Sequence, residues 1–262
     1  IQANILRKYE LDQPVYIQFS HWVRDVAKGD LRESFQYIGL PVKTIISESL
    51  PVSLLLGGLA LIFAIALGIP FGCVAAWRQN TRLDHIAMFF AISGISLPGY
   101  LVASILVLVF SLQLGWFPPA LWEGPSSMVL PVVTLAWRPM AILARLTRSS
   151  MIETLQSDYI RTARSKGLSD TVIIFKHALK NSLIPVITIL GPLAAHLVTG
   201  SFLVEIVFQI PGMGKHFVQA VINRDYPLVM GVTLCYGVIL LLSNLFVDLA
   251  YGWVDPRIRM ET

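Results

Sequence analysis

Charged residues are scarce in this sequence. Of its 262 residues only 14% are Asp, Glu, Lys or Arg, whereas 55% are hydrophobic even with glycine left out of the count. An ordinary globular domain has about 25% charged residues and about 45–50% apolar ones with glycine included. So few charges could not cover a soluble core of this size, which argues against a soluble enzyme, a disordered chain and a nucleic-acid-binding protein. The net charge of +4 is therefore no sign of a nucleic-acid partner.

Motifs for metal binding, catalysis and energy conversion are also missing. The two cysteines, Cys73 and Cys235, lie inside apolar runs and predict no disulfide, and no two of the five histidines stand four residues apart, as a helical metal site needs. Residues 211–216 (PGMGKH) resemble a phosphate-binding loop, but its first glycine is absent and His216 replaces the magnesium-binding Ser or Thr. We therefore expect no catalytic residue, metal or cofactor on this chain.

Five long apolar stretches predict five membrane-spanning helices, and hence an all-α polytopic bundle. The stretches are residues 49–77, 86–122, 129–150, 181–204 and 226–247. Each is long enough to cross about 30 Å of hydrocarbon as a helix, the form that satisfies the backbone in lipid. The second exceeds one span, and we expect its helix to end near Gly115, Pro118 and Pro119.

Lys and Arg residues divide unequally between the loops that join these stretches. Eleven of the 20 lie in loops on one side of the membrane, which are residues 77–85, 145–180 and 253–262. The short loops on the other side, 115–128 and 205–225, contain only Lys215 and Arg224. The positive-inside rule assigns the first set to the cytoplasm.

Residues 1–48 then form an external arm before a membrane domain of residues 49–262. A helix that begins near Asp12 and Pro14 and stops at Gly29 carries one apolar face, made of Val15, Phe19, Trp22, Val23 and Val26. This face lies on the membrane surface or packs over the mouth of the bundle, and packing is the simpler prediction. Because nothing in the arm is apolar enough to span, we expect a further membrane helix before residue 1.

The loop 153–180 has the clearest pattern in the sequence. Residues 158–167 (DYIRTARSKG) predict a short basic helix that stops at Gly167, and Ser169 and Asp170 predict the start of a second helix. Helix, glycine turn and helix make a rigid projection from the membrane face. Such a projection is either an interfacial helix on anionic lipid or a docking site for a cytoplasmic partner.

This loop resembles the "EAA" coupling loop of bacterial ABC importer permeases. Thr162-Ala163 is followed after three residues by Gly167, with Arg161 where that motif often has Glu. The run 161–167, with residues 183–185 (LIP) farther downstream than usual, is similar to the dipeptide, oligopeptide and nickel branch of the family.

The rest of the chain shares the resemblance, which is closest to the B-type permease subunit of oligopeptide importers. Glu205, residues 211–214 (PGMG) and residues 224–227 (RDYP) resemble the external segment of that branch, and Asp248 with residues 255–259 (DPRIR) resembles its carboxyl terminus. The resemblance implies a type I permease fold with six spans, one of them preceding residue 1.

The resemblance also implies partners and a location. Permeases of this family pair with a second homologous permease subunit, two cytoplasmic ATP-binding subunits that hold ATP and magnesium, and an external substrate-binding protein. They lie in the bacterial inner membrane as multi-pass proteins, and peptide is the expected cargo. The chain itself is then a pathway subunit in the lipid bilayer rather than an enzyme.

Two sets of candidate functional residues follow from this resemblance and from the charges near the spans. The first set would couple to the ATPase through the 158–167 helix and comprises Tyr159, Arg161, Thr162, Ala163, Arg164, Lys166 and Gly167. The small Ala163 would allow close approach of the ATPase, and Gly167 would allow the chain to reverse. The second set would line the pathway or a gate, partly in the external loop 205–226, and comprises Arg138, Glu205, Pro211, Gly212, Gly214 and Asp248.

Arg138 is predicted without help from the resemblance. It lies near the middle of an apolar stretch, where an unpaired arginine costs about 2.5–3.5 kcal/mol on insertion scales. It must therefore face a partner or a watery cavity, which leaves pathway lining and a structural ion pair as alternatives.

Other classes of membrane protein remain as alternatives. A secondary transporter or channel that works without an ATPase would show an inverted repeat, and we find none that is convincing. An intramembrane hydrolase would need a base such as His196 with Ser93, Ser96 or Ser201, but no G-x-S-x-G motif surrounds these serines.

Overall fold

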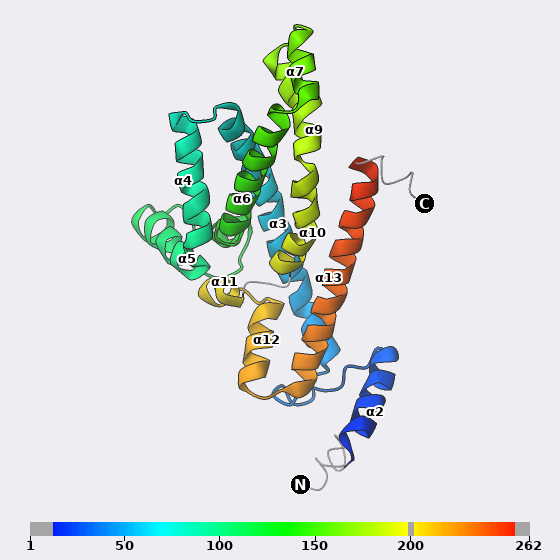
Figure 1. Ribbon diagram of the computed structural model, residues 1–262. Coiled ribbons are helices and arrows are strands. Elements are labelled where there is room, and N and C mark those ends of the chain that lie inside the picture. The colour runs from blue at the N-terminus through cyan, green and yellow to red at the C-terminus, as the bar shows by residue number, and fades with distance from the viewer. Residues whose placement is uncertain (1–12, 199–201, 255–262) are drawn as a thin grey trace.

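The computed structural model describes residues 13–198 and 202–254, whose arrangement Figure 1 shows. In this part of the chain every regular element is a helix, and the strand-like pairing is limited to an isolated antiparallel bridge between Glu33 and Pro41. The prediction of an all-α polytopic bundle is confirmed.

Three helices are long and apolar enough to cross a membrane without a break. They are α3 (Val42–Trp77), α6 (Pro125–Leu155) and α13 (Tyr226–Val254). The most extensive contact among the described helices joins α3 to α6, and it is closest at two glycines of α3. A Cβ atom built on Gly72 would lie 2.5 Å from the Ala144 carbonyl oxygen, and one built on Gly68 would lie 2.7 Å from the Met140 carbonyl oxygen. Small residues therefore let these two backbones approach.

One further span is sharply bent. α4 (Arg82–Ser96) is followed by α5 (Gly99–Leu106) and the π-helical segment η1 (Val107–Gln113), which turn from the α4 axis by 113°. The sequence predicts one helix that ends near Gly115. The end is found, since η1 stops at Gln113, but the prediction of one continuous helix is wrong. Leu97 has extended backbone because Pro98 follows it and disfavours the helical conformation.

The other bent span begins in the loop after α6. α8 (Asp170–Val172), the π-helical segment η2 (Ile173–Ala178) and α9 (Leu179–Ser182) follow one another, and α10 (Ile184–Val198) continues at an angle of 51°. When each bent pair is taken as one span, length and composition give five candidate spans in the described residues, as the sequence predicts.

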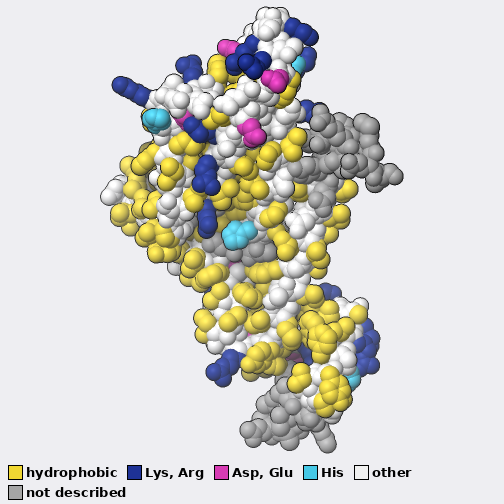
Figure 2. All heavy atoms as spheres, viewed as in Figure 1, with side chains coloured by type: hydrophobic (Ala, Val, Ile, Leu, Met, Phe, Trp, Pro, Cys, Tyr) yellow, Lys and Arg dark blue, Asp and Glu magenta, His cyan; other side chains and the backbone are white. Residues whose placement is uncertain are grey.

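The connecting segments gather at two opposite ends of the bundle. α7 (Asp158–Ser165) projects at the top of Figure 1, whereas α11 (Phe202–Val207), α12 (Met213–Ile222) and α2 (Val15–Ala27) lie toward the bottom. Lys and Arg side chains crowd the upper end in Figure 2, and apolar side chains dominate the middle. We call these the α7 end and the α12 end.

The arm helix α2 stands away from the bundle (Figure 1). None of its residues is buried, and the side chains of Val15, Phe19 and Val23 are exposed. The simpler prediction, packing of this apolar face over the mouth of the bundle, is therefore wrong for the isolated chain. The helix follows Pro14, and Asp12, near which the sequence predicts the helix to begin, lies outside the described residues.

Candidate functional site

α7 is a short projection that ends in a left-handed glycine. Its last helical residue is Ser165, two residues before the predicted end of the 158–167 helix. Gly167 has a φ of +76°, and no atom lies within 4 Å of a Cβ built on it. A side chain would therefore fit the space but most side chains would strain the backbone, so the conformation of this turn favours glycine.

One face of α7 is buried against the rest of the chain. Ile160 is 0% exposed and Ala163 is 6% exposed. They pack in one cluster with residues from the ends of α3 and α6 and from η2, namely Ala76, Met151, Ile173, Ile174 and Ala178. The expectation that Ala163 gives close approach to a partner is wrong, because its small side chain lies against the chain's own helices. Ile160 was not predicted, although two apolar residues three apart in a polar helix signal a buried face.

The other face of α7 carries polar and basic side chains. Its exposed residues are Asp158, Tyr159, Arg161, Thr162, Arg164 and Ser165, and the exposed Lys166 follows the helix. Arg161 pairs with Asp158 at 3.3 Å, but both side chains are more than three-quarters exposed, so the pair adds little stability. The Tyr159 hydroxyl oxygen accepts a hydrogen bond from Asn181 Nδ2 at 2.8 Å, which links α7 to α9.

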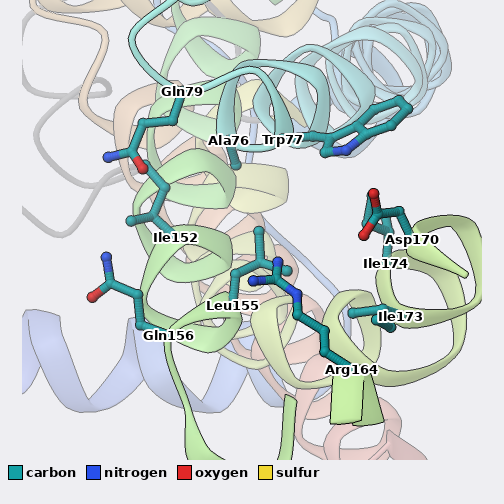
Figure 3. A pocket seen from close by; sticks show the side chains of 10 residues that line it. All are labelled: Ala76, Trp77, Gln79, Ile152, Leu155, Gln156, Arg164, Asp170, Ile173 and Ile174. Carbon is teal, nitrogen blue, oxygen red and sulfur yellow. The ribbon is translucent and has the colours of Figure 1, made fainter. Parts of the chain in front are cut away.

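A cavity of about 350 Å³ lies between α7 and the ends of two spans (Figure 3). Its walls are formed by Ala76, Trp77, Gln79, Ile152, Leu155, Gln156, Arg164, Asp170, Ile173 and Ile174. Arg164 extends from α7 toward Leu155 on the cavity wall in Figure 3, and it is the basic residue among those lining the cavity. The α7 end therefore combines a basic helix face with a partly apolar recess.

An ion pair missed by the sequence analysis braces this end of the bundle. Arg148 in α6 donates through Nε to Asp84 Oδ1 at 2.6 Å and through an Nη atom to Asp84 Oδ2 at 2.7 Å. Asp84, in the first turn of α4, is 1% exposed and also accepts the Asn80 N–H at 2.9 Å. The sequence contains a signal for such a pair, since a lone Asp stands at the start of an apolar helix and several Arg residues lie in the loops on the same side.

At the α12 end the buried Glu205 holds the start of α12. Its Oε1 accepts a hydrogen bond from Ser53 Oγ at 2.9 Å, and its Oε2 accepts the Lys215 N–H at 3.0 Å. Ser53 Oγ in turn accepts the Met213 N–H at 2.8 Å. These bonds satisfy free N–H groups at a helix N-terminus, where negative charge is favoured. Burial raises the pKa of Glu205, and its hydrogen bonds oppose that rise.

Gly212 and Gly214 make room for this carboxylate. A Cβ atom on Gly212 would lie 2.5 Å from Glu205 Oε1, and one on Gly214 would lie 3.1 Å from Glu205 Oε2. Pro211, the next predicted residue, directly precedes this turn. The segment that resembles a phosphate-binding loop is therefore filled by the chain's own carboxylate. The structure thus brings together four predicted residues and adds Ser53, whose hydroxyl the sequence pattern did not single out.

A second buried carboxylate, Asp225, joins the arm to α13. Its Oδ1 accepts the N–H groups of Phe35 at 3.1 Å and Leu228 at 3.3 Å, and its Oδ2 accepts the Gln36 N–H at 3.2 Å. Ser34 Oγ also donates to Oδ2. The sequence analysis missed this role, although an Asp just before a helix with Pro227 in its first turn is a typical cap.

The remaining predicted residues lie apart from both ends. Arg138 is exposed midway along α6, and none of the ion pairs among the described residues includes it. A structural ion pair within the described chain is therefore not formed. Asp248 lies in α13, and its side chain is outside the described part.

Comparison with protein families now identifies the chain. The model of the family "binding-protein-dependent transport system inner membrane component" matches residues 68–260. The chain belongs to this family. The resemblance seen in the 161–167 run is confirmed, and membership favours a permease over a transporter that works without an ATPase.

Relatives match over almost the whole chain. The dipeptide transport system permease protein DppB of Bacillus subtilis is 47% identical over 261 residues, which cover 100% of this chain and 85% of the relative. The oligopeptide transport system permease protein OppB of Haemophilus influenzae is 44% identical, with 99% of this chain and 85% of the relative covered.

Solved structures confirm the fold of this permease family. An inward-facing structure of the MetNI methionine ABC transporter has a TM-score of 0.67 at 15% identity and covers 80% of this chain and 96% of the solved chain. The crystal structure of an amino acid ABC transporter with histidines has a TM-score of 0.63 at 16% identity and covers 80% of this chain and 94% of the solved chain. The prediction of a permease fold of ABC importers is therefore confirmed.

Proposed function

We propose that this chain is the permease subunit of an ATP-driven peptide importer in the bacterial inner membrane, where it forms half of the substrate pathway. The observation that carries the proposal is the 47% identity, over the whole chain, to a dipeptide permease. The basic helix α7, projecting from the end of the bundle, supports it. The chain is a pathway subunit, and ATP with magnesium would be bound and hydrolysed in partner subunits.

The partners that complete the importer are three kinds of protein. A second homologous permease subunit would form the other half of the pathway, two ATP-binding subunits would dock on the α7 end, and an external binding protein would deliver the peptide. The family description, which names dependence on a binding protein, supports the last of these. The excess of positive charge at the α7 end supports a cytoplasmic position for that end.

The packing of α7 explains how a docked ATPase could drive the spans. Ile160 and Ala163 contact residues at the ends of α3 and α6 and in η2, and Tyr159 is hydrogen-bonded to α9. A displacement of α7 would therefore act on three spanning segments together. Such a rigid lever suits a switch between inward-facing and outward-facing arrangements of the bundle.

The exposed face of α7 offers the matching chemistry. Arg161, Arg164 and Lys166 present positive charge that would pair with acidic residues of an ATP-binding subunit. The neighbouring cavity of about 350 Å³ would receive a side chain of the docked subunit beside Arg164.

The α12 end would supply the gate and the contact with the binding protein. Glu205 ties α11 and the start of α12 to Ser53 of α3, so the loop 205–226 moves with that span. Pro211, Gly212 and Gly214 shape the turn that the carboxylate fills. We assign this unit to the external gate, and the apolar face of α2 to the membrane surface.

Charge reversal on α7 tests the docking. We would co-express the tagged chain with its ATP-binding subunits and replace Arg161→Glu and Arg164→Glu together. The ATP-binding subunits should then no longer co-purify, while the yield of the permease stays unchanged because α7 lies outside the spans. Arg82→Glu, another exposed basic residue at the same end, is the matched control and should retain them. Full co-purification with the double variant would overturn the docking assignment.

A further inference from the structure

A polar stripe runs down the exposed face of α6. Its exposed residues from the middle of the helix to the α7 end are Arg138, Arg145, Ser149, Glu153 and Gln156. Spacings of seven, four, four and three residues place all five on one face of a helix. The stripe therefore connects the middle of the span to the basic end of the molecule without interruption by an exposed apolar residue.

Exposed residues on other spans have the opposite character. Those of α13 are largely leucine, valine and phenylalanine, including Val238, Leu241 and Phe246, as expected of a surface that faces lipid. Figure 2 shows Lys and Arg side chains descending from the α7 end into the apolar middle of one face, with a histidine below them. Two arginines on a lipid-facing surface would be expensive, so the α6 stripe faces water or polar groups.

α10 and the preceding α9 carry a similar stripe. The exposed residues between 181 and 197 are Asn181, Pro185, Thr188, Pro192 and His196, again on one helical face. α10 contacts α6 directly. Two neighbouring spans therefore each expose a face free of large hydrophobic side chains, as the wall of an aqueous passage requires.

The polar stripe of α6 ends at Arg138, and a layer of buried residues lies beyond it. Farther toward the α12 end, Leu130, Thr134 and Leu135 are all buried, and the two leucines belong to the same core cluster as Val204 of α11 and Phe208 directly after it. Arg138 is thus the last exposed polar residue on this face before the closed layer. A passage along this face would open toward the α7 end, with Arg138 at its inner limit.

We propose that Arg138 and Arg145 form a cationic ladder that binds the carboxylate of the peptide as it leaves the closed layer. The inference rests on the proposed function and names the chemical group that this wall recognises. The two arginines are seven residues apart, which is about 10 Å along the helix axis. A peptide carboxylate could therefore pass directly from one arginine to the other. Neither arginine is paired with an acidic residue of the described chain. Guanidinium binds carboxylate through two parallel hydrogen bonds, and the C-terminal carboxylate is the anion that every free peptide carries.

The test compares a peptide that has this carboxylate with one that lacks it. The complete importer is reconstituted in vesicles with ATP inside, and uptake of trialanine and of trialanine amide is measured for each variant. Arg138→Gln and Arg145→Gln remove the charge, Arg138→Lys retains it, and Arg82→Gln removes a positive charge elsewhere. Each uptake rate is divided by that of the parent protein for the same peptide, so any preference of the binding protein cancels.

If the two arginines bind the carboxylate, their replacement should reduce the uptake of trialanine, which has a free carboxylate, but not that of trialanine amide. Arg138→Gln and Arg145→Gln should each lower trialanine uptake about tenfold and leave uptake of the amide within about twofold, the scale of one charge-assisted contact. Arg138→Lys retains the charge but not the paired hydrogen bonds of guanidinium, so it should restore only part of the trialanine uptake. Arg82→Gln should change the uptake of neither peptide. Equal loss for both peptides would overturn the ladder in favour of an ion pair with the second permease, and no loss would also overturn it. Failure of the parent importer to take up either peptide would instead refute the proposed function.

Discussion

Among the described residues, buried charged side chains are few, and each accepts several hydrogen bonds. Glu205 and Asp225 are 0% exposed, Asp84 is 1% exposed, and each accepts hydrogen bonds that join segments far apart in the sequence. A buried carboxylate without partners would cost several kcal/mol, so these contacts must form together with the fold. Single residues therefore fix how the arm, α12 and α4 lie against the spans.

Removal of the Glu205 carboxylate should loosen the α12 end. Glu205→Ala leaves the Lys215 N–H and the Ser53 hydroxyl without their acceptor, and we expect it to lower the free energy of unfolding by about 2–4 kcal/mol. Glu205→Gln retains one acceptor oxygen and should cost about half as much. Thermal unfolding in detergent measures both, and an alanine variant as stable as the parent would contradict the anchoring role.

Acidification should weaken the contact between the arm and α12 through His216. Burial lowers the pKa of His216, whose Nδ1 lies 3.5 Å from the Tyr37 hydroxyl, so the folded chain favours the neutral imidazole. The stability that depends on this group is fully present above its unfolded pKa of about 6.5 and is lost as the pH falls through the lowered folded pKa. Histidine ordinarily titrates between about pH 7 and pH 5. Over this range the unfolding temperature should therefore fall more steeply in the parent than in His216→Gln. Parallel curves would exclude His216 as the cause.

At the scale of elements, the contact of α3 with α6 depends on glycines that allow close approach. Gly72→Ala places a methyl group against the Ala144 carbonyl oxygen and the Thr147 side chain, and should lower the free energy of unfolding by about 1–3 kcal/mol. Gly58→Ala is the matched control on the same helix, since no atom lies within 4 Å of its Cβ. It should be neutral or stabilise the protein by up to about 1 kcal/mol. Similar losses in both variants would show that helix flexibility, not close approach, is what glycine supplies.

The turn after α7 gives a prediction about coupling. Gly167→Leu should uncouple ATP hydrolysis from transport, because a left-handed backbone costs a branched side chain about 1–2 kcal/mol and the turn would shift α7. Gly167→Asn should retain most transport, since Asn tolerates this conformation and the space around the residue is open. The ATPase rate and the uptake rate of the reconstituted importer, measured side by side, give the number of ATP molecules hydrolysed per peptide imported. Full uptake by the leucine variant would refute the role of this turn.

For the whole molecule, periodicity and charge could predict the helices but not the contacts between them. The spans follow from apolar runs, and the α7 projection follows from a basic segment that ends in Gly167. The break at Leu97 follows from Pro98, which the sequence contains, whereas the partners that bury Ala163 are set by tertiary packing, which the sequence does not show. The pairing of Asp84 with Arg148 spans 64 residues, so the sequence shows a lone aspartate at the start of a helix but not which arginine pairs with it.

The central claim is that this chain imports peptide only as part of an assembly driven by ATP. The most direct measurement is uptake of a labelled tripeptide into vesicles that contain the permease pair, both ATP-binding subunits and the binding protein. We predict uptake that requires internal ATP and persists when proton and sodium gradients are abolished. Uptake by the permease alone, driven by an ion gradient without ATP, would contradict the account.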